Sequence, residues 1–186
     1  MRLFIAINLP ENAKDIISDS VQKLEKIYRD ERFIPRENWH LTICFLGYQP
    51  DEAIGPILEA TKETAAEFSK PEIELEKIIL APPDRPEKRM VWLAGAKKTS
   101  EILGELENNL EKKLIENKVK FKIDYPVFNS HLTLVRMEYP SRNFLPPELP
   151  DFRPIVFRAE SLDLMESHLK RTGAEYEIIS QFAFKA

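Results

Sequence analysis

The order β-strand, long helix, His-Leu-Thr strand occurs twice in this chain, and this repeat is the feature that most restricts the fold. The three patterns follow one another at about 2–8, 11–30 and 39–46, and again at about 89–95, 100–117 and 131–137. A shared tripeptide alone arises easily by chance, but not in the same place of a repeated order. We therefore predict a bilobal α+β fold, internally duplicated, with approximate two-fold symmetry and antiparallel sheets.

The two motif strands carry the chain's most informative polar side chains. They contain His40-Leu41-Thr42 and His131-Leu132-Thr133, and the two histidines are two of only three in 186 residues. Because side chains alternate along a strand, each histidine and its threonine point the same way. Approximate two-fold symmetry would place the motif strands on opposite walls of one cleft between the lobes. The imidazoles would then face each other across it.

The remaining patterns complete a single domain of two halves over residues 1–186. A helix is predicted from Asp51 to about residue 67, and the Pro-rich loop 81–88 is the best candidate for a boundary between the halves. Further strands are predicted at about 72–80, 155–165 and 175–184, the last two forming a hairpin through Gly173.

Composition restricts location and partners. The net charge of −4 argues against tracking a long phosphate backbone, so any nucleic-acid contact should be local. A single cysteine, Cys44, excludes an intramolecular disulfide and fits a reducing cytoplasm. The N-terminal apolar run is shorter than the core of a signal peptide, and no other run could span a membrane. We expect a cytoplasmic monomer.

Two imidazoles across a cleft can divide one displacement at phosphorus. One activates water as a base while the other protonates the departing oxygen, since both protonation states are accessible near neutrality. The hydroxyls of Thr42 and Thr133 can bind the non-bridging phosphate oxygens. Neither motif places a carboxylate beside its histidine, so we expect no metal and no other cofactor.

Arg136 follows the second motif and could neutralise a bound phosphate. Strict alternation puts it on the face opposite to His131, so it either reaches the phosphate through a β-bulge or forms a surface salt bridge. Cys44 would share the motif face as a nucleophile or as a small packed residue. Arg89 and Trp92 line the cleft or belong to the core, and His168 is expected to be exposed. Phe33, Tyr125 and Phe128 are candidates for stacking a base or for the core.

On these residues the chain resembles the two-histidine phosphoesterase superfamily, specifically the RNA 2′,3′-cyclic phosphodiesterases, also called 2′-5′ RNA ligases. The resemblance extends over nearly the whole length through the segments Arg2–Ile7 with Leu9-Pro10, Glu37–Gly47, Val91–Leu93, His131–Arg136, Gly173–Glu177 and Phe182. Relatives commonly carry lysine where this chain has Cys44. Where relatives have tryptophan before the Glu-Asn-x-His run, this chain offers Phe33 or Trp39.

The resemblance implies a fold with the active site between two lobes. It also implies hydrolysis of a terminal 2′,3′-cyclic phosphate to a 2′-phosphomonoester, with His40 as proton donor to the leaving oxygen and His131 as base. Thr42 and Thr133 would bind the phosphate. The expected partners are RNA ends or nucleotide 2′,3′-cyclic phosphates. The alternatives are 2′-5′ RNA ligation and a non-catalytic module that binds RNA or nucleotides.

Overall fold

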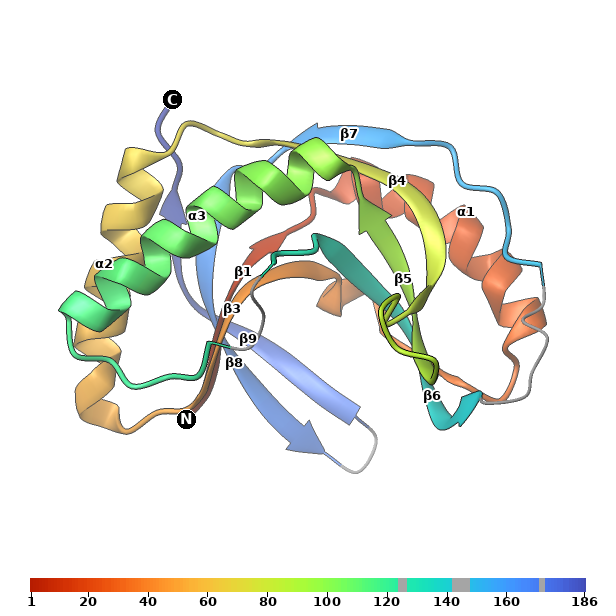
Figure 1. Ribbon diagram of the computed structural model, residues 1–186, viewed down its shortest axis with the longest axis horizontal. Helices are drawn as coiled ribbons and strands as arrows, with labels where there is room; N and C mark the ends of the chain where they lie inside the picture. The colour runs from red at the N-terminus through yellow and green to blue at the C-terminus, as the bar shows by residue number, and fades with distance from the viewer. Residues whose placement is uncertain (124–126, 142–147, 171–172) are drawn as a thin grey trace.

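The computed structural model describes residues 1–123, 127–141, 148–170 and 173–186. Its strands form two sheets in which every neighbouring pair is antiparallel (Figure 1). The first sheet has the order β3 (His40–Tyr48), β1 (Arg2–Asn8), β8 (Ser161–Lys170), β9 (Gly173–Ala183). The second has the order β2 (Arg32–Phe33), β6 (His131–Ser141), β5 (Lys88–Gly95), β4 (Glu72–Ala81), β7 (Ile155–Arg158).

Within the described residues, three α-helices and two short 3-10 helices connect these strands. They are α1 (Glu11–Ile27), η1 (Arg36–Asn38), η2 (Asp51–Ala53), α2 (Ile54–Glu67) and α3 (Lys97–Glu116). Helices α2 and α3 lie against each other; α2 contacts β8 and β9, and α3 contacts β3 (Figure 1). Helix α1 lies on the other side of the molecule and contacts β7. No helix in the described part of the chain is both long and apolar enough to cross a membrane.

The repeated order of elements is present in the structure. In each sheet a strand leads through a long helix to an antiparallel neighbour, β1–α1–β3 in the first and β5–α3–β6 in the second. The apolar spacing explains the helices, because α3 buries Leu103, Leu106, Leu110 and Leu114 on one side. The predicted α+β class with antiparallel sheets is confirmed.

One continuous hydrophobic core draws on both sheets and on all three helices. Ile5 of β1, Ile17 of α1, Ile57 of α2, Leu93 of β5 and Leu103 of α3 are all fully buried members of it. Strand β1 is buried on both faces, because Phe4 and Ala6 form a second, smaller cluster on its other side. This strand therefore lies between the core and the face that carries the first motif.

Two expectations about connections are wrong. The Pro-rich loop 81–88 joins β4 to β5, which are neighbours in one sheet, so it is a hairpin connection and not a boundary between halves. The run 155–165 is not one strand, because the chain leaves the second sheet after Arg158 and enters the first at Ser161. The break lies at Ala159, whose amide donates to the carbonyl of Pro71. The predicted hairpin through Gly173 is formed by β8 and β9 alone.

Candidate active site

The two motif strands meet where the sheets adjoin. Strand β3 is at an edge of the first sheet, β6 is the second strand of the other sheet, and the two strands contact each other (Figure 1). Each motif histidine is the first residue of its strand, and both imidazoles are half-buried. The positive charge of the His131 imidazole lowers the pKa of His40.

Both imidazoles are oriented by the same local contact. His40 Nδ1 donates to the carbonyl oxygen of Asn38 and His131 Nδ1 donates to that of Asn129, each over 2.7 Å. A carbonyl oxygen only accepts, so Nδ1 carries a proton in both rings and Nε2 is the nitrogen left for exchange. The asparagines were not predicted as site residues. The sequence signal was the longer repeat Asn-x-His-Leu-Thr, which contains both asparagines whose carbonyl oxygens accept these hydrogen bonds.

A β-bulge in β3 removes Cys44 from the motif face. In the β1–β3 pairing Ala6 is opposite Thr42 and Ile5 is opposite Cys44, so Ile43 is an extra residue. The extra residue inverts the alternation beyond it. Cys44 therefore points into the core and is 5% exposed. The expectation that Cys44 shares a face with His40 and Thr42 is wrong.

A second bulge brings Arg136 to the motif face of β6. Trp92 is opposite Thr133 and Val91 is opposite Val135, so Leu134 is the extra residue. Met90 is then opposite Arg136 and shares the face of Trp92 and Ala94 on the alternating strand β5. Of the two alternatives for Arg136, the β-bulge is present, and no described carboxylate forms an ion pair with this guanidinium.

The surroundings of the two histidines differ although their backbone contacts match. His40 lies between Phe4 and Tyr176, with ring centroids 5.0 Å away in both cases. His131 stacks on Trp92 with centroids 3.7 Å apart and an interplanar angle of 16°. The two histidines therefore have equivalent backbone contacts but different aromatic neighbours.

These environments favour the neutral form of both imidazoles. The pKa of His40 is lowered from 6.5 to about 4, mainly by burial and in smaller part by the charges of Arg136 and His131, while the hydrogen bond to the Asn38 carbonyl opposes the shift. Burial also lowers the pKa of His131; the Asn129 carbonyl opposes this effect and Arg136 adds to it. An anion between the rings would raise both pKa values, because it stabilises the imidazolium forms.

The motif threonines lie where the sequence places them. Thr42 and Thr133 each follow a histidine by two residues on the same face, and both are half-buried. Neither hydroxyl is engaged in a hydrogen bond with the described residues, so both are free to contact a ligand. Two pockets are lined by residues that contact the histidines. One of about 470 Å³ includes Asn38 and Tyr176, and one of about 980 Å³ includes Trp92 and Asn129.

The structure separates the aromatic candidates. Trp39 is 2% exposed and donates its Nε1 hydrogen to the carbonyl of Ile34, so it belongs to the core. Phe33 lines the smaller pocket and Phe128 the larger one, while Tyr125 lies outside the described residues. Phe45 was missed by alternation, because the bulge at Ile43 turns it to the motif face, where it is 53% exposed.

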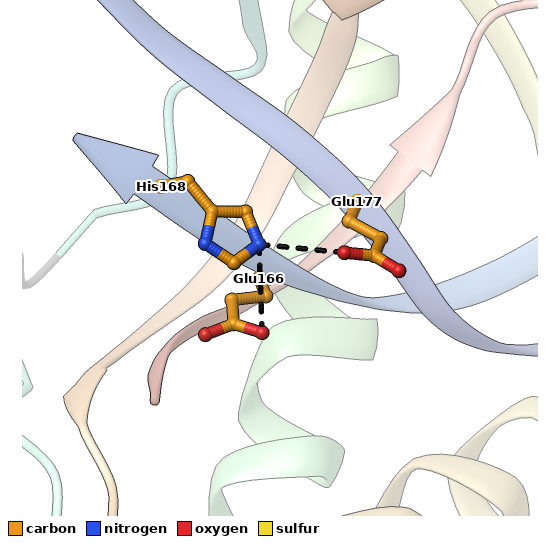
Figure 2. A group of neighbouring side chains, drawn as sticks. All are labelled: Glu166, His168 and Glu177. Atoms are coloured by element: carbon orange, nitrogen blue, oxygen red, sulfur yellow. Dashed lines mark ion pairs between the residues drawn. The ribbon is translucent and has the colours of Figure 1, made fainter. Parts of the chain in front are cut away.

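Two other candidates lie away from the motifs. Arg89 forms an ion pair with Glu87 over 3.2 Å. His168 on β8 is 43% exposed. Its Nε2 lies 3.6 Å from a carboxylate oxygen of Glu166, also on β8, and 3.4 Å from one of Glu177 on β9 (Figure 2). These three side chains could hold a cation, since their ligand atoms lie within 4.8 Å of one another, but ion pairing alone also accounts for the group.

Comparison with known proteins gives concordant results. A family model described as LigT-like phosphoesterase matches residues 7–92. An RNA 2′,3′-cyclic phosphodiesterase of Archaeoglobus fulgidus is 30% identical over 166 residues, which cover 82% of this chain and 89% of the relative. A protein of the same name from Methanocaldococcus jannaschii is 27% identical over 187 residues, covering 98% of this chain and all of the relative.

Solved structures share the whole fold. A crystal structure of a Thermus thermophilus protein superimposes with a TM-score of 0.77 at 25% identity, covering 99% of this chain and 98% of the other. Escherichia coli LigT complexed with 3′-AMP gives a TM-score of 0.74 at 21% identity, covering 100% of this chain and 98% of the other. The predicted family is confirmed by these matches, and the chain belongs to the LigT-like phosphoesterase family.

Proposed function

We propose that the protein hydrolyses the terminal 2′,3′-cyclic phosphate of RNA to a 2′-phosphomonoester without a metal ion. One observation carries the proposal. Two imidazoles from different sheets are oriented identically through Nδ1, so that each keeps Nε2 for proton exchange, and each has a threonine hydroxyl on the same face. The relatives named RNA 2′,3′-cyclic phosphodiesterase support the choice of substrate.

The reaction needs one proton accepted and one donated. His131 Nε2 takes a proton from water as the water oxygen attacks phosphorus. The bond from phosphorus to O3′ breaks, and His40 Nε2 gives its proton to O3′, leaving a 3′-hydroxyl and a 2′-phosphate. The imidazoles exchange protonation states and return to the start by proton exchange with solvent.

The anion-binding groups surround this reaction centre. The hydroxyls of Thr42 and Thr133 donate to non-bridging oxygens, and the Arg136 guanidinium compensates the charge that develops during attack. The cyclic phosphate is itself an anion, so its arrival raises the pKa of His40 and favours the protonated acid that burial disfavours. Phe45, exposed on the same face as His40, offers a surface on which the terminal base can stack.

The decisive experiment uses purified protein and an oligoribonucleotide that ends in a 2′,3′-cyclic phosphate. We expect a single product with the phosphate on O2′, identified by chromatography against 2′- and 3′-phosphate standards. A 3′-phosphate product would contradict the assignment of the acid. Ligated RNA without net hydrolysis would favour 2′-5′ ligation, and binding without turnover would favour a non-catalytic module.

A further inference from the structure

Two arginines occupy directly opposite positions on neighbouring strands beside the motif. Arg32 of β2 pairs with Arg136 of β6, so the two side chains leave the sheet on the same face. Like charges directly opposite each other destabilise a sheet. Both residues are exposed, and neither forms an ion pair with any carboxylate in the described ranges. The chain as a whole has more acidic than basic residues, so two arginines side by side on one face form a local positive charge. Such a local charge favours an anionic ligand.

Arg32 reaches from the second sheet to the first. Gly173, the first residue of β9, has φ +146°, and a Cβ at this position would lie 2.0 Å from Nη2 of Arg32. The guanidinium therefore rests directly on the glycine backbone at the β8–β9 turn. A side chain at Gly173 would displace it and would also strain the backbone.

The pocket beneath this guanidinium adjoins the histidine site. Arg32 lines the pocket of about 470 Å³ together with Asn38 and Tyr176, and these two residues both contact the His40 ring. Phe33 adds apolar surface. A ligand that extends from His40 along this side would therefore meet Arg32.

The pocket also contains carboxylates, which restrict what it can hold. Glu175 is engaged by Lys170, whereas Glu37 is exposed. A group of several phosphates would be repelled by these charges. A nucleoside joined to a single phosphodiester fits better, because its base meets apolar and carboxylate surface while one anionic group meets Arg32.

We propose that Arg32 binds the phosphodiester that precedes the terminal nucleotide, and that the site therefore prefers the end of an RNA chain to a free nucleotide. The inference rests on the proposed function, because it extends the same site by one nucleotide. Strands β2 and β6 are adjacent, about 5 Å apart, so Arg136 can serve the reacting phosphate while Arg32 serves its neighbour.

The test compares two substrates with and without Arg32. Wild type and Arg32→Ala are assayed on a mononucleoside 2′,3′-cyclic phosphate and on an oligoribonucleotide with the same terminal nucleotide. We expect Arg32→Ala to lower kcat/KM on the oligonucleotide about ten-fold, as loss of a charged hydrogen bond implies, and to leave the mononucleotide rate unchanged. The salt dependence on the oligonucleotide should weaken by a slope of about 0.7, the value for one phosphate of a single strand.

A matched control is Arg158→Ala, an exposed arginine on β7 at the opposite edge of the same sheet. It should leave both rates and the salt slope unchanged. Equal losses of Arg32→Ala on both substrates would overturn the proposal in favour of a structural role, and no loss on either would overturn it in favour of a free surface residue. Failure of the wild type on both substrates would instead refute the proposed function itself.

Discussion

The indole of Trp92 stacks on the imidazole of His131, with ring centroids 3.7 Å apart. Trp92 is opposite Thr133 in the β5–β6 pairing, so one residue supports the histidine and flanks the threonine of the second motif. Its buried Nε1 finds no hydrogen-bond partner among the described residues. Packing alone therefore holds the indole, whose face restricts rotation of the His131 ring and excludes water from one side of it.

Replacing Trp92 should slow the reaction without abolishing it. We expect Trp92→Leu to lower kcat on a cyclic-phosphate oligonucleotide by about ten- to hundred-fold, because a small displacement of a reacting group has effects of that size. Trp92→Phe keeps a flat ring and should retain most of the rate. Equal rates for the two variants would show that the stacking does not position His131.

Removal of either motif histidine should cost most of the activity. We expect His40→Ala and His131→Ala each to lower kcat by about 10²–10⁴-fold while the far-ultraviolet circular dichroism stays unchanged. The double variant should lose little more than one single variant, because the two residues act as a unit. His168→Ala removes the third histidine and serves as the control, with a rate equal to wild type. Multiplicative losses in the double variant would count against paired roles.

The charge of Arg136 should be visible in the titration of both imidazoles. Arg136 lowers the pKa of His40 and of His131, because a nearby cation disfavours the imidazolium. Arg136→Gln should therefore raise both values, measured by NMR titration of the ring protons in the unliganded protein. Arg158→Gln should leave them in place. An unchanged or lower His40 pKa in Arg136→Gln would place the guanidinium away from the motif face in solution.

Metal removal should leave the reaction intact. The imidazoles of His40 and His131 perform the proton transfers of the proposed mechanism, and neither lies in the Glu166–His168–Glu177 group. We expect full activity after dialysis against excess chelator and no gain when zinc is returned. Activity lost to chelator and restored by zinc in wild type, but not in His168→Ala, would assign that group a catalytic metal.

The sequence predicts the elements well and the faces of the motif strands only in part. Regular patterns such as the leucines of α3 locate the helices, because burial repeats every three to four residues. The faces of Cys44 and Arg136 depend on extra residues at Ile43 and Leu134, which are defined only by the partner strands β1 and β5. Alternation therefore places Cys44 wrongly and leaves Arg136 undecided.

Contacts between segments that are distant in the chain could not be predicted from the sequence either. The stacking of Trp92 on His131 and the approach of Arg32 to Gly173 join residues that no local pattern connects. The crossing from the second sheet to the first near Ala159 is hidden for a similar reason. The run 155–165 looks like one apolar strand, but its first part, β7, pairs with β4 and its second part, β8, pairs with β1. Tertiary packing, and not the local sequence, determines which sheet each part joins.

The two bulges make the pairing of the motif strands, rather than their composition, decide which side chains share the motif face. With the same residues and no bulge, plain alternation along β6 would carry Arg136 to the opposite side and bring Val135 in its place. Deleting the extra residue Leu134 would instead leave Arg136 opposite Met90, because the regular ladder would resume one residue earlier. A related chain with one residue fewer at this point can therefore keep a cation over the motif, whereas a chain of the same length needs the bulge to do so.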